Sequence, residues 1–367
     1  MIYNLTNNEN SKMRNAIYVT AVCGGFFIFL EILIRVSLFS GSLGLKIFKN
    51  PDLYGSYSGD NDYWKLYYQL VNEYKYPASD RVQSVLGWSQ DVVGEQNPLG
   101  LWQESLDRLT MKTDHTKILF YGDSYIRGAS SPAYEIPRYV NNNLKDVTVA
   151  DLGVGGYGLD QMYLMFRSTL SYARGSHVVF GVLIDDDLDR SILSVRTGQK
   201  PHLVIKDGKL FVENVPIDPN PERYFSTNPP KIISYLFRLV SRLPEIWNVV
   251  PDRKIGEKKT LNGKIIEELH SICQKEEIPL SFILFYTKYS LRNVSWQEDF
   301  MKTKLNELGI TYIDTKPLLV DYANSNGLDM SAFYVNDGYQ REHHNDLGNQ
   351  VISDNLIDYF HKDFNLY

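Results

Sequence analysis

The sequence predicts an α/β protein built on a three-layer α/β/α, doubly wound parallel sheet, with one N-terminal transmembrane helix. From about residue 116 onward, short apolar runs rich in β-branched and aromatic residues alternate with longer amphipathic segments. Strands that alternate with helices form a parallel sheet covered by helices on both faces. A separate apolar stretch near the N-terminus is long enough to cross a lipid bilayer.

The expected elements of the sheet follow a regular order along the chain. Five runs have strand length: 118–121, 147–152, 177–184, 280–286 and 310–313. Apolar residues recur between them at helical spacing: Leu159, Met162, Tyr163 and Phe166, then Ile265, Ile266 and Leu269. The segment at about 196–255 breaks this order, because it holds a hairpin pattern around Asp207-Gly208 and several prolines. The alternation resumes afterwards, so we interpret this segment as an insertion in one domain.

The apolar stretch near the N-terminus is expected to be an uncleaved membrane anchor. Residues 16–30 form an unbroken run that resumes after Glu31, for about 24 residues in all, enough to span ~30 Å of hydrocarbon. Lys12 and Arg14 precede the run, so the positive-inside tendency predicts that the rest of the chain lies outside the cytoplasm. A cleaved signal peptide and a soluble amphipathic helix are the alternatives, but no Ala-x-Ala-type cleavage site follows.

Two charged residues interrupt the end of this stretch. Glu31 and Arg35 are four residues apart on one helix face, where they are able to pair or to reach the membrane interface. Tyrosines and tryptophan at near-helical spacing follow within 54–76, and we interpret them as a packed helix rather than a glycan-binding platform. The expected segments are a cytoplasmic tail (1–14), an anchor (15–40), an aromatic-rich juxtamembrane region (41–115) and the α/β domain (116–367).

Composition excludes several classes of protein. The formal charge of −6 arises from 38 basic and 44 acidic residues without long blocks of either, so no basic stripe suggests nucleic-acid binding. Cys23 lies in the apolar N-terminal stretch and Cys273 in the α/β domain, so a disulfide between them is not expected. Neither cysteine belongs to a CxxC metal or redox motif, and we expect no cofactor.

A Gly-Asp-Ser motif ends the first expected strand, with its serine at Ser124. Ligands of open parallel sheets bind beyond the carboxyl ends of the strands. A serine there becomes a nucleophile only with a base within hydrogen-bond reach, usually a histidine oriented by a carboxylate, and with donors for the oxyanion. Asp337, His343 and His344 supply such groups just before the last amphipathic segment.

These motifs, in this order, resemble the SGNH (GDSL-type) hydrolases. The glycine-rich sequence DLGVGGYG at 151–158 is similar to the family's oxyanion turn, and HHNDLG at 343–348 to its histidine block. The resemblance covers about 116–362 and implies a flavodoxin-like sheet. It also implies Ser124 as nucleophile, His343 as base, Asp337 as the acid and a backbone N–H of Gly156 in the oxyanion hole.

The sequence departs from the family pattern at two places. Asp186 occupies the position where the family has an oxyanion asparagine, and an ionised carboxylate only accepts hydrogen bonds. Asp186 therefore serves the oxyanion only if it is protonated, or else Arg190 or a backbone N–H replaces it. Asp337 lies six residues before His343, whereas the family has its acid three residues before the histidine, where this chain has Gln340.

Two further features have competing interpretations. Asp185, Asp186 and Asp187 resemble a divalent-metal site, but consecutive side chains point apart and no histidine is near in sequence, so no metal is expected. His344 is expected to support the site or to be exposed rather than to act as the base.

The expected function follows from the motifs and the anchor. An outward-facing serine ester hydrolase encounters envelope lipids and surface glycans, so we expect O-acyl esters, above all O-acetyl groups on an envelope or surface glycan. The expected partners are this acylated glycan or a lipid ester and the membrane, with no nucleic acid. One alternative is an O-acyltransferase that modifies a surface polysaccharide. The other is a catalytically silent scaffold or glycan-binding protein of a polysaccharide assembly system.

Overall fold

The computed structural model describes residues 2–40, 46–71, 77–247, 249–336, 338 and 342–364. The chain divides into two compact units. Unit 1 comprises Met1–Lys75 and Phe225–Asp252, and unit 2 comprises Tyr76–Tyr224 and Arg253–Tyr367. This division differs from the expected segments at two places. Residues 76–115 belong with the sheet rather than with the juxtamembrane region, and only the second part of the expected insertion leaves the α/β domain.

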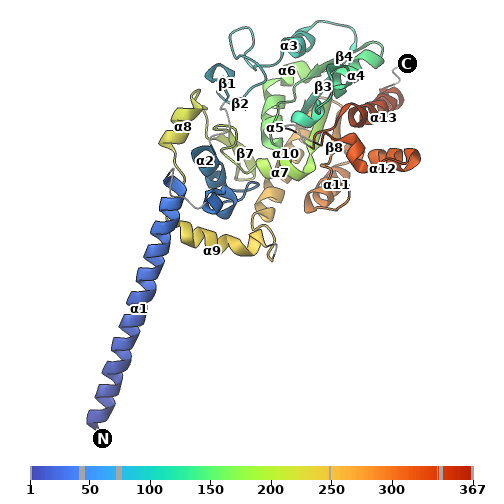
Figure 1. Cartoon of the computed structure of the whole chain (residues 1–367). Helices are drawn as coiled ribbons and strands as arrows, with labels where there is room; N and C mark the ends of the chain where they lie inside the picture. Colours follow the sequence, from blue (N-terminus) through green and yellow to red (C-terminus); the bar gives the residue numbers. More distant parts are fainter. Residues whose placement is uncertain are drawn as a thin grey trace. The chain divides into compact units, whose positions relative to one another are not determined.

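Unit 2 contains the expected parallel sheet, with strand order β4-β3-β5-β8-β9 (Figure 1). Its strands are β3 (Thr116–Gly122), β4 (Val147–Asp151), β5 (Ser176–Leu183), β8 (Leu280–Phe285) and β9 (Thr311–Asp314). All four neighbouring pairs are parallel. The strand order reverses at β3, because β4 lies on one side of it and β5 on the other. Ligand sites of doubly wound sheets form at such a reversal.

Helices cover the sheet in two groups. On one side α4 (Ile136–Asn143) packs against α13 (Asp346–Phe364), which packs against α12 (Thr315–Asn326). In the other group, α10 (Ile255–Lys275) packs against α5 (Leu159–Ser168), α7 (Ile184–Arg190) and α11 (Trp296–Leu308). The remaining helices are α3 (Gln103–Thr110), α6 (Leu170–Ala173) and α8 (Pro221–Thr227), in which the boundary between the units falls.

Two short hairpins complete unit 2. β1 (Val82–Gln83) pairs with β2 (Gly87–Trp88), and β6 (His202–Lys206) pairs with β7 (Lys209–Glu213). The second is the hairpin predicted around Asp207-Gly208, where both turn residues have positive φ, +49° and +73°. This conformation matches the twist of the flanking strands.

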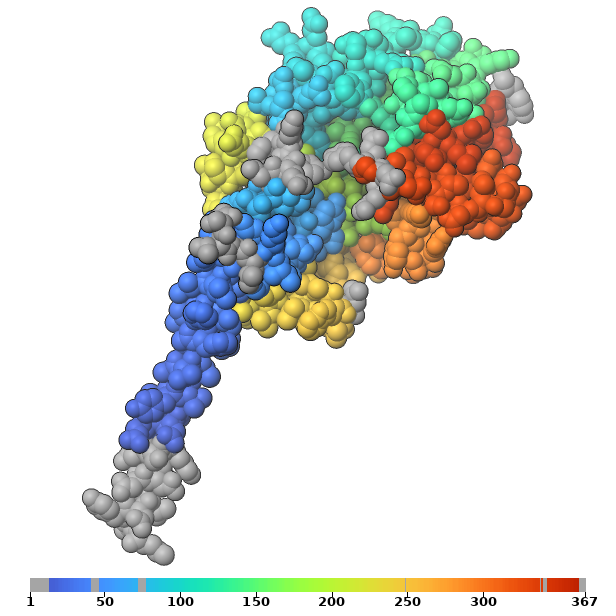
Figure 2. Space-filling view, viewed as in Figure 1, coloured from blue at the N-terminus to red at the C-terminus, as the bar shows by residue number. Residues whose placement is uncertain are grey.

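Unit 1 is helical. Its elements are α1 (Ile2–Phe39), α2 (Asn61–Leu70), α9 (Tyr235–Ile246) and two 3-10 turns, η1 (Lys46–Lys49) and η2 (Pro51–Leu53). Tyr63, Trp64 and Tyr68 of α2 are buried, as expected of a packed helix. Met13–Phe39 of α1 is long and apolar enough to cross a membrane, which is compatible with an anchor or a signal sequence. Figure 2 shows the described outer part of α1 in blue, extended away from other residues.

Candidate active site

Ser124 lies directly after β3, at the first residue of a short 3-10 turn, η4 (Ser124–Ile126). The carboxylate of Asp123 accepts the N–H of Tyr125 at 2.8 Å and so fixes the turn. Position 122 requires a glycine. A Cβ there would lie 2.4 Å from a side-chain carbon of Ile126 and 2.8 Å from the carbonyl oxygen of Gly181. The glycine lets the turn fold back against the sheet, which leaves the Ser124 side chain at the edge of the strand.

His343 meets Ser124 across 219 positions of sequence. Its Nε2 lies 2.8 Å from the Ser124 Oγ, a hydrogen-bond distance. The imidazole packs on the ring of Tyr125, with centroids 4.9 Å apart. Burial raises the pKa of Tyr125 well above its usual value, so its hydroxyl stays protonated and donates to the carbonyl of Glu342 at 2.7 Å. The structure thus brings together the two residues that the motifs nominated as nucleophile and base.

The backbone around His343 is held by a short antiparallel pairing. The N–H of Val335 donates to the carbonyl of His343, and the N–H of Glu342 donates to the carbonyl of Val335, each at 2.9 Å. In addition, the N–H of Asn345 donates to the carbonyl of Phe333 at 2.9 Å. These bonds fix the loop that carries the imidazole before α13 begins, so no helix is needed to position it.

The predicted catalytic acid is Asp337. Asp337 lies outside the described residues, as do Gln340 and Arg341 at the positions where the family has its acid. The orientation of His343 by Asp337 therefore stays a prediction. Val335 and His343, which are described, are hydrogen-bonded to each other.

The glycine turn after β4 runs beside the serine. A Cβ at Gly155 would lie 3.8 Å from the Cβ of Ser124, so this residue is in contact distance of the nucleophile. Gly156 has a φ of +81°, which favours glycine. Among the described residues, no hydrogen bond uses the backbone N–H of Ser124, Gly155 or Gly156. These are the donors that an oxyanion hole requires.

Segment 88–90, which the sequence did not identify, fixes this turn through its carbonyl groups. The indole Nε1 of Trp88 donates to the carbonyl of Gly155 at 2.9 Å, and the Gln90 side chain donates to the carbonyl of Gly153. Because C=O and N–H of one peptide unit point in opposite directions, the bond from Trp88 directs the Gly156 N–H away from the indole. Local sequence gave no signal for these contacts, since both bridge more than 60 positions of chain.

Arg196 supports the same turn from another loop. Its guanidinium donates to the carbonyl of Gly156 at 2.7 Å. A Cβ at Gly156 would lie only 2.1 Å from that guanidinium nitrogen, so the glycine makes room for the arginine. Hydrogen bonds therefore hold the turn at the carbonyl groups of Gly153, Gly155 and Gly156. The N–H groups of Ser124, Gly155 and Gly156 make no hydrogen bond among the described residues.

Asp186 does not present a proton to this turn. It lies in α7, and its carboxylate accepts from Arg190 Nη2 at 2.5 Å. Burial acts to raise the pKa of Asp186, but the nearby guanidinium groups of Arg190 and Arg196 outweigh it and hold the pKa below the usual value. Asp186 is therefore ionised near neutral pH and is a hydrogen-bond acceptor. The geometry shows Asp186 in an ion pair with Arg190.

Arg190 is the centre of a buried charge cluster behind Ser124, which we call the Arg190 cluster: Arg190, Asp123, Asp186 and Asp187. Its guanidinium lies 2.9 Å from the Asp123 carboxylate and 2.6 Å from that of Asp187. Burial, reinforced by the neighbouring Asp123, raises the pKa of Asp187 well above its usual value. The cluster therefore holds Asp123 in place beside the nucleophile, with a single cation shared among three acids.

The aspartate run at 185–187 is used for such pairings. Asp185 accepts the N–H and the hydroxyl of Thr287 at 3.2 and 3.0 Å, and also the hydroxyl of Ser290. Asp185 therefore has partners of its own, whereas Asp186 and Asp187 share Arg190. Within the described part of the chain, no group of three or more His, Cys, Asp or Glu side chains is arranged to hold a metal ion.

His344 is buried and plays a different part from His343. Its ring packs among those of Tyr125, Phe285 and Tyr334. Burial, with a smaller contribution from neighbouring His343, lowers its pKa to about 3, so the ring is neutral. It supports the aromatic layer beneath the site, as expected of a residue that is not the base.

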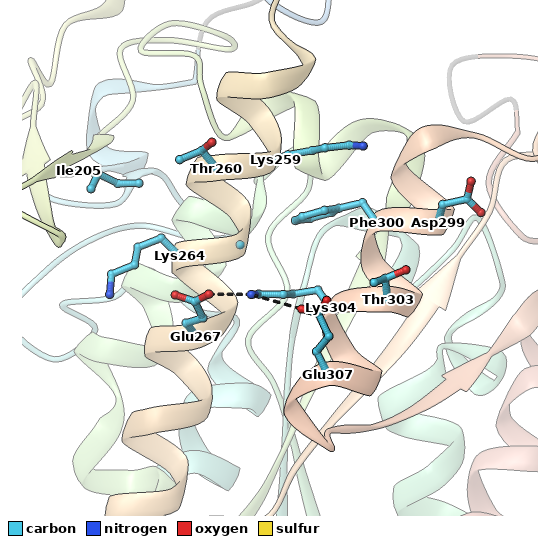
Figure 3. A pocket seen from close by; sticks show the side chains of 11 residues that line it. Ile205, Lys259, Thr260, Lys264, Glu267, Asp299, Phe300, Thr303, Lys304 and Glu307 are labelled. Atoms are coloured by element: carbon cyan, nitrogen blue, oxygen red, sulfur yellow. Dashed lines mark hydrogen bonds and ion pairs between the residues drawn. The ribbon is translucent and has the colours of Figure 1, made fainter.

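The hollow shown in Figure 3 lies elsewhere in unit 2. It has a volume of about 560 Å³ between α10 and α11, and Lys259, Phe300 and Lys304 contribute to its wall. Lys304 Nζ is held by Glu267 at 2.6 Å and lies 3.7 Å from Glu307. Neither Ser124 nor His343 lines this hollow, so it is not part of the candidate active site.

Comparison with known proteins gives matches only among solved structures. No protein-family model and no curated protein sequence matches the chain. A lipolytic protein of the G-D-S-L family from Veillonella parvula is similar over 67% of this chain and 98% of its own, at 12% identity and a TM-score of 0.40. The acetyl xylan esterase AlAXEase is similar over 66% and 98%, at 14% identity and a TM-score of 0.39. A two-domain esterase described as active on acetylated mannans is similar over 68% and 49%, at 10% identity and a TM-score of 0.37.

Proposed function

We propose that this chain is a membrane-anchored serine esterase of the SGNH type that cleaves O-acyl esters, with O-acetyl groups of an envelope or surface glycan as its substrate. The observation that carries the proposal is the 2.8 Å distance between His343 Nε2 and Ser124 Oγ. A serine and a histidine in this arrangement, beyond the carboxyl end of a parallel strand, form the reacting pair of an acyl-transfer enzyme. A protein with only a scaffolding role has no need of such a pair.

The first chemical step forms an acyl-enzyme. His343 takes the proton of Ser124 while the serine oxygen attacks the ester carbonyl, and it then returns the proton to the leaving alcohol. Water then attacks the acyl-enzyme, again with His343 as base, and releases the free acid. Both steps pass through a tetrahedral oxyanion, which needs fixed donors.

Backbone N–H groups supply these donors in the proposal. The N–H groups of Ser124 and Gly156 are free of hydrogen bonds among the described residues, and the Gly156 turn is tied by Trp88 and Arg196. Donors that are held in place before the reaction stabilise the oxyanion without further reorganisation. Asp186 is left out of this set because its carboxylate is paired with Arg190.

Asp337 is proposed to orient His343. Val335 is hydrogen-bonded to the carbonyl of His343. Asp337 follows Val335 by two positions in the sequence. An acid at this position would select the tautomer of His343 whose Nε2 accepts the serine proton.

The anchor determines which esters the enzyme meets. We propose that α1 crosses the membrane within Met13–Phe39, with the basic residues Lys12 and Arg14 toward the cytoplasmic side, so that unit 2 lies outside. Esters on that side belong to envelope lipids and surface glycans.

Labelling with a serine-directed fluorophosphonate tests the proposal. The full-length protein in detergent should gain the mass of one phosphonyl group on the peptide that contains Ser124, and Ser124→Ala should gain none. Incubation with an acetylated glycan should then release acetate in the wild type but not in Ser124→Ala. An unlabelled wild type, under conditions in which another serine esterase reacts fully, would overturn the assignment of Ser124.

A further inference from the structure

α9 is apolar on two adjoining sides, and only one of them is covered by the protein. On the covered side, Tyr235 is buried in a cluster with Ile34 and Leu38 of α1 and with Tyr54 and Leu66. The other side, which we call the outer face of α9, is exposed. It comprises Ile233, Phe237, Val240 and, beyond the end of the helix, Trp247 and Val249.

The outer face is a continuous stripe rather than scattered residues. Phe237, Val240 and Trp247 are separated by three and seven positions, the spacing of one side of a helix, and Ile233 lies just before the start of α9. Phe237 is 74% exposed and Trp247 68%, far more than large aromatic side chains usually are in water. Such a stripe requires an apolar environment to cover it.

The start of α9 is fixed to the end of the apolar part of α1. The carboxylate of Glu31 accepts the N–H groups of Tyr235 and Leu236 at 3.1 and 2.9 Å. Arg35 lies 2.6 Å from Glu31 and donates to the carbonyl of Ile233 at 2.7 Å. The two charged residues that interrupt the apolar stretch therefore cap the N-terminus of α9.

The length of α1 places this junction at one edge of a bilayer. From Met13 to Leu30 the helix is largely exposed and carries no charged side chain except Arg14. Eighteen residues of α-helix rise about 27 Å, close to the ~30 Å thickness of bilayer hydrocarbon. A helix that crosses the bilayer with these residues has Glu31 and Arg35 at the interface, and α9 begins there. Figure 2 shows α9 in gold beside the inner end of the blue helix.

We propose that the outer face of α9 lies in the lipid interface of the same bilayer that α1 spans. The occupant is the lipid surface, because the face is continuous with the membrane segment through Glu31 and Arg35. Apolar aromatic side chains on one side of a helix at headgroup level are typical of interfacial helices, and tryptophan is enriched there. Unit 1 is then held at two places, through the bilayer by α1 and along its surface by α9. This arrangement prevents rotation of unit 1 about the axis of α1.

The inference rests on the proposal that α1 stays in the membrane, and a spin-label experiment separates the two. The full-length Cys23→Ser protein is reconstituted into vesicles of equal parts phosphatidylethanolamine and phosphatidylglycerol. Cys273 does not interfere, because burial raises the pKa of its thiol to about 12. Single cysteines are introduced as Phe237→Cys, Val240→Cys and Trp247→Cys. Matched controls are Tyr289→Cys and Val294→Cys, two exposed apolar positions of unit 2. Retained fluorophosphonate labelling of Ser124 shows that each variant is folded.

The expected result is that labels on α9 collide with dissolved oxygen but are shielded several-fold from a water-soluble nickel chelate, relative to the labels at 289 and 294. Equal nickel accessibility at all positions, in protein that remains with the vesicles after alkaline washing, would overturn the placement of α9 while leaving the anchor intact. Labels that are immobile and shielded from both reagents would also overturn it, because they would indicate a protein partner or a second copy. Release of the protein by alkaline washing would instead contradict the anchor itself.

Discussion

The Ser124–His343 pair and the Arg190 cluster are neighbouring polar regions of unit 2 with opposite construction. The pair consists of two partly exposed side chains joined by one hydrogen bond and held by their backbones. The cluster consists of the buried side chains of Arg190, Asp123 and Asp187 and the partly exposed Asp186, and one guanidinium serves its three carboxylates. A buried charge network is strongly sensitive to the loss of one member, whereas an exposed pair is not. The comparison therefore predicts that substitutions in the pair remove turnover and leave stability, while substitutions in the cluster lower stability.

His343→Ala should have the largest effect on turnover. Loss of the base of a serine–histidine pair typically lowers kcat by at least about 10⁴-fold. The free energy of unfolding should change by less than about 1 kcal/mol, because the ring is partly exposed and its backbone is held independently. Hydrolysis of p-nitrophenyl acetate by the full-length protein measures the first quantity and urea unfolding the second. His115→Ala, at an exposed histidine, is the control. Near-normal turnover in His343→Ala would remove the basis for the esterase.

Asp337→Asn should lower kcat by about 10³- to 10⁴-fold, because an amide stabilises the wrong histidine tautomer. The unfolding midpoint should stay at the wild-type value. Asp114→Asn is a suitable control, since Asp114 is an exposed aspartate of the same unit. Full activity in Asp337→Asn would show that another group orients His343.

Arg190→Met tests the other side of the comparison. Removing the shared cation leaves buried Asp123 and Asp187 uncompensated, so the free energy of unfolding should fall by about 3–5 kcal/mol. Arg292→Met breaks an exposed pair with Asp329 and should cost at most about 1 kcal/mol. Equal urea midpoints for the two variants would mean that the Arg190 cluster does not stabilise unit 2.

The same contrast explains how much the sequence could predict. The sheet, the β6–β7 hairpin and the Ser124 and His343 positions follow from local patterns, since strand ends and turns have their own residue preferences. The partners of Gly155 and Arg190 do not follow from local patterns, because tertiary packing brings them together from distant parts of the chain. Trp88 reaches Gly155 across 67 positions, and the run of acids around Asp186 gives no indication that Arg190 neutralises it.

A pair of adjacent glycines allows a finer test of the oxyanion turn. Gly156→Ala forces a side chain into a φ of +81° and against Arg196, so it should lower the free energy of unfolding by about 1–3 kcal/mol. Gly155→Ala meets only an ordinary 3.8 Å contact with Ser124, so its stability should stay close to wild type. Both variants should show reduced turnover, because both disturb the donors beside Ser124. Equal stability of the two would contradict the role given to Arg196.

Asp186→Asn should have the smallest effect and separates the two roles considered for this residue. The pKa of Asp186 is lower in the folded chain than its ordinary value, so its ion pair with Arg190 contributes stability above the unfolded pKa of about 3.9. That contribution is lost as the pH falls through the lower, folded pKa. The wild type should therefore exceed Asp186→Asn in unfolding free energy by about 1–2 kcal/mol at neutral pH, and the difference should disappear as urea midpoints are measured below about pH 4.

Turnover of Asp186→Asn should fall little, and the alkaline limb of its pH–activity profile should be unchanged. If Asp186 instead donated a proton to the oxyanion, wild-type activity would decline as that proton was lost with rising pH, and the asparagine variant would abolish the decline. Such a profile would move Asp186 from the Arg190 cluster to the reacting centre.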